Sequence, residues 1–353
     1  MHPTTNVIWN VRSRTWPTRC DLVNPSFQAP VIGWTSRRVL VTGADGFVGH
    51  WLVRALAARG AHVYGLVWSG GGNNERARDR IQGPGVEVIR GDITDLAYIS
   101  KLIANSVIDT VYHLAAINTN TGSNVSPYEV FETNIRGVYT VLEACRIAPH
   151  QVRAVVSSSR EVEDCFLPVA TRKHHPYMTS KAAAELAARA YSDTFGVSVA
   201  LVRSDNLYGG GDFNWSRLVP GTMRAILQGK IPVIRSNGLS RHDYVYIEDA
   251  VAAYLAIGER LDSPAINGGL FRVATGSGTS VLEMVKQIAR VAGLPDLEPH
   301  VLNEKTEERV DTLYVPELER IVLGWNIQYS LEDGLTHTYR WYRDFLREEM
   351  GAS

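Results

Sequence analysis

Cysteine is scarce in this chain of 353 residues, which contains only Cys20, Cys145 and Cys165. The number is odd, the three residues are far apart and no CxxC pair occurs. The sequence therefore predicts neither a disulfide framework nor a structural zinc site. We expect a cytoplasmic protein whose functional site contains no metal ion.

The sequence also lacks long hydrophobic runs and an excess of charge of either sign. No apolar run approaches the roughly 18 residues that a membrane-spanning helix needs. Lys and Arg number 36 against 37 Asp and Glu, which gives a net charge of −1 with histidine neutral. Such a balance provides no whole-molecule field to attract a nucleic acid polymer. We therefore expect a soluble protein with no membrane partner and no nucleic acid partner.

Residues 1–35 contain tryptophan, proline and arginine but no continuous apolar segment of the kind that a secretory signal has. We interpret them as an irregular N-terminal arm, and its tryptophans Trp9 and Trp16 suggest that it packs against another surface. The chain length is that of one large domain or two closely associated ones.

From residue 36 onward, short β-branched runs alternate with helical patterns. The strand-like runs are residues 38–42, 62–67, 86–89, 110–114, 152–156 and 197–202, and the helical stretches are residues 47–59, 96–105, 127–146 and 178–195. This alternation predicts βαβ crossovers and a parallel sheet that is covered on both faces. We therefore expect an α/β fold, a Rossmann-type doubly wound parallel sheet.

The pattern loosens after residue 206 and predicts a smaller C-terminal α+β lobe. Helical patterns cover 216–228 and 280–292, and 231–234 reads as a short strand. We assign the two domains from these shifts in pattern. The dinucleotide-binding domain comprises residues 36–206 with about 240–275 returning, and the substrate lobe comprises residues 207–239 and 276–353.

A glycine-rich turn follows the first predicted strand and begins the first helix. Gly43, Gly46 and Gly49 have the spacing GxxGxxG, with Phe47 and Val48 in the same turn. At this point of a βαβ unit, backbone amides and the positive end of the helix can hold a pyrophosphate. The sequence therefore predicts a bound nicotinamide dinucleotide.

The second predicted strand does not end in the acidic residue that would bind an NAD ribose, since Ser69 stands there. Arg76 and Arg78 follow in a polar loop and could meet a 2′-phosphate, so NAD and NADP both remain open. Other expected cofactor contacts lie at the ends of later strands. They are Asp92 and Ile93 near the adenine, the run His113, Leu114, Ala115 and Ala116 near the nicotinamide, and Ser157.

Tyr177 and Lys181 form a YxxxK pair that places a phenol and an ammonium one helical turn apart on one face. The cation can favour the phenolate of a group that otherwise titrates near pH 10. We predict that Tyr177 acts as a general base, although YxxxK alone also occurs by chance.

These motifs together resemble the extended short-chain dehydrogenase/reductases that modify nucleotide sugars. The resemblance runs from about Arg37 to the C-terminus, and residues 34–49, 206–211 and 217–220 most resemble the CDP-glucose 4,6-dehydratase branch. The motifs that carry it are GxxGxxG at 43–49, HLAA at 113–116, SSSREV at 157–162, YxxxK at 177–181 and RHDYVYIED at 241–249. The resemblance implies bound NAD or NADP, a nucleoside-diphosphate sugar as substrate, and transient oxidation at C4 of the sugar.

The resemblance also implies roles for single residues. Tyr177 takes the proton of the C4 hydroxyl while hydride passes to the nicotinamide, Lys181 supports it, and Ser159 hydrogen-bonds the same hydroxyl. On the substrate side, Arg241 matches a diphosphate-binding arginine, Asn206 lies beside the sugar and Arg217 is a basic position of the lobe. Arg235 is a weaker candidate. Surface ion pairs are the alternative for these arginines.

The resemblance further implies that Arg160 and Glu161 determine what happens to the 4-keto intermediate of the sugar. Dehydratases of the dTDP-glucose type have an aspartate and a glutamate here, as acid and base. GDP-mannose dehydratases have a non-acidic residue before the glutamate, so Glu161 could make both proton transfers. The next residues, Glu163 and Asp164, stand where the family usually has tyrosine and glycine. We predict a 4,6-dehydratase.

Arg160 also leaves a different chemistry open. A guanidinium binds carboxylates in bidentate geometry, so a nucleoside-diphosphate uronate could be the substrate of a decarboxylase or a 4-epimerase. An alcohol dehydrogenase that exchanges its cofactor and a non-catalytic member of the fold are further alternatives. In the simplest structural interpretation Glu161 caps a turn and Arg160 points to solvent.

In the family, two helices of each chain pair into a four-helix dimer core. The corresponding helices here are residues 127–146 and 177–195. The resemblance therefore implies a homodimer.

Overall fold

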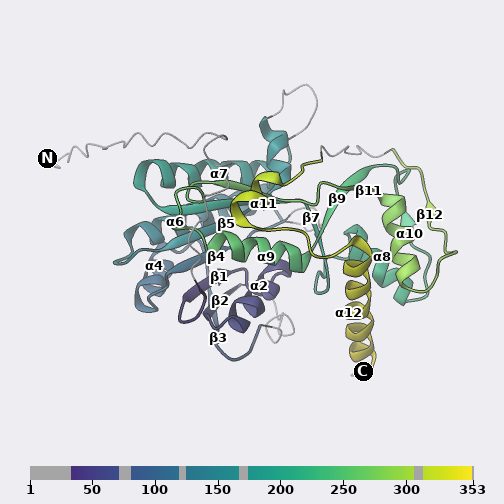
Figure 1. Cartoon of the computed structure of the whole chain (residues 1–353), viewed down its shortest axis with the longest axis horizontal. Helices are drawn as coiled ribbons and strands as arrows, with labels where there is room; N and C mark the ends of the chain where they lie inside the picture. The colour runs from purple at the N-terminus through teal and green to yellow at the C-terminus, as the bar shows by residue number, and fades with distance from the viewer. Residues whose placement is uncertain (1–32, 71–80, 119–124, 167–173, 306–312, 352–353) are drawn as a thin grey trace.

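The computed structural model describes residues 33–70, 81–118, 125–166, 174–305 and 313–351. Its largest element is a parallel seven-stranded sheet in the order β10-β6-β5-β4-β1-β2-β3. The strands are β1 (Arg38–Thr42), β2 (His62–Trp68), β3 (Val86–Gly91), β4 (Thr110–His113), β5 (Arg153–Ser159), β6 (Ser198–Ser204) and β10 (Leu270–Val273). The predicted doubly wound fold is confirmed (Figure 1).

Helices cover both faces of this sheet. On one face lie α2 (Phe47–Ala58) and α9 (Ile247–Gly258), and on the other lie α4 (Leu96–Asn105), α6 (Gly137–Ile147) and α7 (Pro176–Phe195). Alternate residues of β1 point to opposite faces: Val39 and Val41 join the core with α2 and α9, and Leu40 joins the core with α6 and α7. Because both faces are buried, the strands are almost continuously apolar.

The helical stretch expected at 127–146 is not one regular helix. It consists of α5 (Pro127–Phe131), a π-helical turn η2 (Glu132–Arg136) and α6. Asn134 lies in the π turn and directs its amide to the backbone of Ile117, outside the helix. A π bulge of this kind often marks a functional site.

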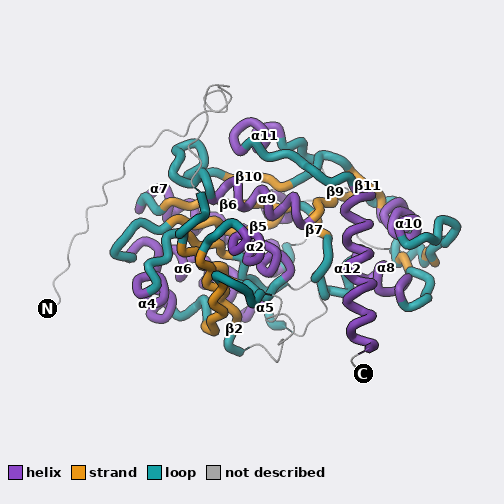
Figure 2. The backbone as a smooth tube through the Cα atoms, turned by 60° about the horizontal axis from the view of Figure 1, so that its bottom comes forward, coloured by secondary structure: helices purple, strands orange, loops and turns teal. Residues whose placement is uncertain are grey.

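The C-terminal lobe lies to one side of the large sheet (Figure 2). Its strands are β7 (Asn206–Tyr208), β9 (Arg241–Tyr246) and β11 (Gly278–Ser280) in one sheet, and β8 (Val233–Ile234) with β12 (His300–Val301) in another. Its helices are α8 (Leu218–Leu227), α10 (Val281–Val291) and α12 (Leu331–Gly351), and a shorter helix α11 (Glu317–Leu323) packs near α9. Between the lobe segments the chain returns to the large sheet through α9 and β10.

Parts of the sequence predictions fall outside the described residues, namely Cys20, Trp9, Trp16 and both loop arginines, Arg76 and Arg78. Among the described residues, no helix is long and apolar enough to cross a membrane. The same residues contain no group of three or more His, Cys, Asp or Glu side chains that could hold a metal ion.

Candidate active site

A cavity of about 540 Å³ opens at the carboxyl ends of the large sheet, where the lobe meets it. Most of the residues predicted from the sequence contribute to its wall. They are Gly43, Gly46, Phe47, Val48, Gly49, Leu114, Ala116, Ser157, Ser159, Glu161, Tyr177, Lys181, Asn206 and Arg217. Segments far apart in the sequence thus converge on one site, as they do in open α/β sheets.

The glycine turn packs so closely on the protein's own backbone that it requires residues without a Cβ. Gly43 has a φ of +67°, and a Cβ on it would come within 2.9 Å of the backbone of Ala115. A Cβ on Gly49 would overlap the carbonyl oxygen of Gly43. Helix α2 begins directly after Gly46, at the cavity wall, and has no acidic residue in its first turn. This glycine cradle at a helix N-terminus therefore fits a pyrophosphate, which Gly43, Gly46 and Gly49 would hold.

Four predicted cofactor residues, Asp92, Ile93, His113 and Ala115, do not belong to the described cavity wall. His113 is buried, with its Nδ1 3.0 Å from the hydroxyl oxygen of Thr42. Asp92 accepts hydrogen bonds at 2.8 Å from the backbone and hydroxyl of Thr94. Ile93 is buried against Gly137, and Ala115 packs on Gly43. At the end of β2 the indole of Trp68 is exposed, where NAD-binding proteins often have an acid. These positions stay predictions.

Tyr177 and Lys181 lie in the first turns of α7, which begins with Pro176 behind the N-cap residue His175. The Nζ of Lys181 donates a hydrogen bond of 2.9 Å to the carbonyl oxygen of Ser157 and lies 6.0 Å from the centre of the Tyr177 ring. Burial lowers the pKa of Lys181 to about 8, although the nearby charge of Glu185 opposes this shift.

The phenol of Tyr177 is harder to ionise than the YxxxK pattern suggests. Burial, and next the charge of Glu161, raise its pKa to about 12, while Arg217 and a hydrogen bond with Ser159 act in the other direction. The cation that opposes the shift is Arg217 rather than Lys181. The phenol is therefore protonated at neutral pH.

Two residues that the sequence did not single out hold Tyr177 in place. The Ser180 hydroxyl donates a hydrogen bond of 2.7 Å to the carbonyl oxygen of Tyr177 and accepts one of 2.9 Å from the Asn134 amide. Asn134 also exchanges hydrogen bonds of 2.7 and 2.9 Å with the backbone of Ile117. An asparagine within an otherwise helical stretch was the available signal, since its amide competes for backbone groups.

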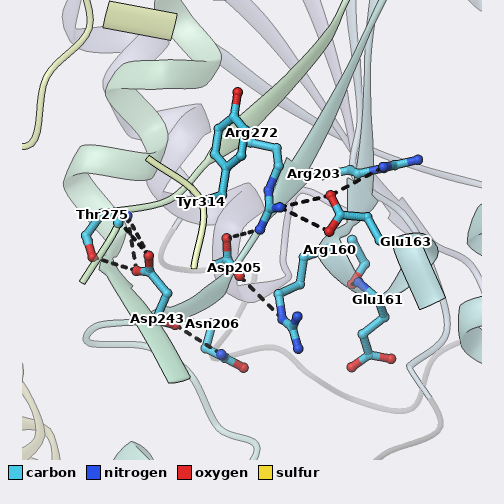
Figure 3. A network of polar contacts seen from close by, with 12 residues as sticks. Arg160, Glu161, Glu163, Arg203, Asp205, Asn206, Asp243, Arg272, Thr275 and Tyr314 are labelled. Atoms are coloured by element: carbon cyan, nitrogen blue, oxygen red, sulfur yellow. Dashed lines mark hydrogen bonds and ion pairs between the residues drawn. The ribbon is translucent and has the colours of Figure 1, made fainter. Parts of the chain in front are cut away.

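Arg160 and Glu161 begin the 3₁₀ helix η3 (Arg160–Phe166), and the Arg160 guanidinium contacts Asp205 (Figure 3). The backbone N–H of Glu161 donates to the Ser159 hydroxyl at 3.2 Å, and its side chain lines the cavity. Arg160 does not point to solvent, because it is buried, with its Nε 3.3 Å from Oδ1 of Asp205. It is not among the described residues that line the cavity.

On the substrate side, the lobe residues differ in position. The Asn206 amide donates to the Asp243 carbonyl oxygen at 3.0 Å, and Arg217 pairs with Asp212 at 3.1 Å, both at the cavity wall. Arg241 lies outside the wall and pairs with Glu283 at 3.1 Å. The fourth arginine, Arg235, is largely exposed and pairs with Glu304. Surface ion pairs therefore describe Arg235 and Arg241 in this structure.

Comparison with known proteins identifies the family. Residues 39–270 match the model of the NAD dependent epimerase/dehydratase family. The chain is 30% identical to UDP-glucose 4-epimerase from Mycolicibacterium smegmatis, over 87% of this chain and 99% of that protein. It is 29% identical to dTDP-glucose 4,6-dehydratase from the same organism, over 87% of this chain and 93% of the relative.

The fold agrees with these sequence matches. The structure of UDP-glucose 4-epimerase with UDP-glucose from Thermotoga maritima superposes with a TM-score of 0.77 at 24% identity, covering 88% of this chain and 99% of that one. The curated relatives also include reductases, and some trifunctional plant relatives match over only 47% of their length. The match of the family model, the 30% identity and the glycine cradle lead to one conclusion: the chain belongs to the NAD-dependent epimerase/dehydratase family.

Proposed function

We propose that the protein is a nucleoside-diphosphate-hexose 4,6-dehydratase that oxidises C4 of its sugar transiently. The observation that carries this proposal is the position of Glu161. Its carboxylate lines the same cavity as Tyr177 and is close enough for its charge to raise the pKa of that phenol. A carboxylate beside the C4 base is what removal of a proton from C5 requires.

In the proposed reaction, different residues of the cavity wall bind the cofactor, orient the sugar and transfer protons. Gly43, Gly46 and Gly49 would hold the pyrophosphate of NAD or NADP, and the bound nicotinamide supplies reversible acceptance of hydride. Ser159 orients the C4 hydroxyl. The Oη of Tyr177 accepts the proton of that hydroxyl after the phenol has released its own proton to solvent, an ionisation that the nearby charge of Arg217 favours. Once C4 is a ketone, the C5 proton is acidic, so Glu161 removes it and returns a proton to the C6 hydroxyl as that group leaves as water. Return of the hydride to C6 and protonation of C5 then complete the reaction and leave a 4-keto-6-deoxy sugar.

A 4-epimerase is the second candidate, because one observation favours it. Arg160 stands where dehydratases of the dTDP-glucose type have their acid, and Asp205 holds its guanidinium. Epimerisation needs only the oxidation and reduction steps at C4, which Tyr177, Lys181 and Ser159 serve.

A single experiment distinguishes dehydration from epimerisation by the mass of the product. The purified protein is given UDP-, dTDP-, CDP- and GDP-hexoses, and the products are analysed by mass spectrometry and chromatography. Loss of the mass of one water with formation of a 4-keto sugar supports the dehydratase. A new isomer of unchanged mass supports the epimerase. No reaction with any hexose would contradict the proposal.

We also propose that the protein forms a homodimer through α5, α6 and α7. These helices leave apolar side chains exposed on one side of the sheet: Tyr128, Phe131, Tyr139, Leu186 and Phe195. Exposed apolar residues that gather on neighbouring helices are typical of protein interfaces.

A further inference from the structure

Asp205 is a residue of the cavity wall that the sequence did not single out. It follows β6, directly before Asn206, and is buried although the residue belongs to the cavity wall. Its Oδ1 lies 3.3 Å from Nε of Arg160, and its Oδ2 lies 2.8 Å from Nη2 of Arg272 (Figure 3). The ion pair between Asp205 and Arg160 therefore lies at the cavity wall, although Arg160 is not among the described lining residues.

The pair belongs to a network of ion pairs. Among the described residues, it contains three arginines, from η3, β6 and β10, and three carboxylates: Arg160, Arg203 and Arg272 with Asp205, Glu163 and Glu185. Arg272 binds both oxygens of Glu163, at 2.9 and 3.1 Å, and Arg203 binds both oxygens of Glu185, at 2.8 and 2.7 Å. A buried ion stays favourable only while its partner remains in place. In this network Asp205 already supplies Arg160 with a counter-charge.

Asp205 places a buried carboxylate at this point of the cavity wall. Burial raises the pKa of Asp205 to about 6, and the charge of Asp243 adds to this shift, although Arg272 and Arg160 oppose it. The Glu161 carboxylate belongs to the same wall. A third carboxylate on the sugar would meet like charges in a partly desolvated site, which disfavours binding.

We propose that Asp205 acts as an internal counter-charge for Arg160 and thereby restricts the sugar subsite to hexoses that are uncharged at C6. Asp205 is then a specificity-determining residue that excludes uronates. The inference rests on the proposed function, because it takes the sugar to lie between Tyr177 and Asn206 in this cavity.

The first test uses the wild-type protein. Dissociation constants are measured by calorimetry for UDP-glucose and UDP-glucuronate, and for the corresponding dTDP pair. We expect the uronate to bind about tenfold or more weakly than the hexose. Equal affinities, or tighter binding of the uronate, would overturn the proposal, and this result needs no variant to fold.

The second test uses Asp205→Asn, which keeps the shape of the side chain but removes the negative charge beside the Arg160 guanidinium. We expect the affinity ratio to move toward the uronate by about tenfold. The matched control is Glu163→Gln, which removes a charge from the same network at a residue outside the described cavity wall. Glu163→Gln should keep the wild-type ratio of hexose affinity to uronate affinity. The double variant Asp205→Asn/Arg160→Gln should lose the improved uronate affinity that Asp205→Asn alone produces.

The proposed role of Asp205 is contradicted if the ratio of hexose to uronate affinity is unchanged in a folded Asp205→Asn protein. It is also contradicted if Glu163→Gln improves uronate affinity by the same factor. Thermal unfolding of each variant reports whether it is folded. If the wild type dehydrates a neutral hexose while the ratio does not respond to Asp205→Asn, only this inference fails. If the ratio responds but no hexose is oxidised at C4, the inference stands and the proposed function fails.

Discussion

The hydroxyl of Ser180 donates a hydrogen bond of 2.7 Å to the backbone carbonyl oxygen of Tyr177. Asn134 donates to the same hydroxyl from the π turn, so a segment outside the described cavity wall contacts the first turns of α7. We expect Asn134 and Ser180 to act as positioning residues for Tyr177 through its backbone.

Replacing Ser180 by alanine should therefore lower kcat more than it changes KM. The variant loses one accepted and one donated hydrogen bond at a buried site, a cost of about 1–3 kcal/mol in stability. Steady-state kinetics and chemical denaturation measure both effects. A purely structural role would lower stability but leave kcat and its pH profile at the wild-type values.

Tyr177→Phe should keep the fold and the bound dinucleotide but lose turnover by a factor of about 10² to 10⁴, the usual contribution of a general base. Turnover of the substrate found in the hexose panel and the dinucleotide released on denaturation are the two measurements. Turnover near the wild-type rate would remove Tyr177 from the mechanism.

Glu161→Gln should separate the two halves of the reaction. The variant can still oxidise C4, since Tyr177 is intact, but it cannot remove the C5 proton. We expect the absorbance of reduced nicotinamide to rise and persist, with a 4-keto hexose that has lost no water. An enzyme that works as a 4-epimerase would instead keep most of its activity after this substitution.

Lys181 should give the stability of the unliganded protein a distinctive pH dependence. Burial lowers its pKa from 10.5 to about 8, so the folded state loses the proton before the unfolded state does. Burial of the ammonium lowers the free energy of unfolding in full below pH 8, and this loss of stability disappears as the pH rises to 10.5. Relative to Lys181→Met, the wild type should therefore gain about 3 kcal/mol across this interval.

Denaturant unfolding of both proteins between pH 7 and 10.5 measures that difference. A constant difference over the whole interval would show that the ammonium is not desolvated in the folded state.

Leu186→Glu should convert the proposed dimer into a monomer, because it places a charge among the exposed apolar residues of α5, α6 and α7. Ile231→Glu is the control, since Ile231 is equally exposed but lies in the lobe. Light scattering on eluted peaks reports the mass. A monomeric wild type would refute the interface.

The sequence was sufficient for the features that depend on local patterns. The apolar runs of the strands, the glycine turn at Gly43 and the spacing of Tyr177 and Lys181 each lie within one element or one turn. The contact between Arg160 and Asp205 was not predictable in this way. The contact requires the ends of β5 and β6 to lie side by side. It also involves Arg272 of β10, which is 67 residues away from Asp205 in the sequence. The π turn at Asn134 likewise depends on a contact with Ile117 outside the helix.

The position of β10 has a consequence for the newly made chain. This strand pairs with β6 at the end of the large sheet, and most of the residues between them first build the lobe strands and α9. Until residue 273 has been synthesised, β6 is an open edge of apolar sequence with unpaired backbone groups. The unpaired N–H and C=O groups of such an edge can form hydrogen bonds with strands of other chains. Aggregation during synthesis should therefore concentrate in truncated products that end between residues 204 and 270, because these contain the exposed strand without its partner.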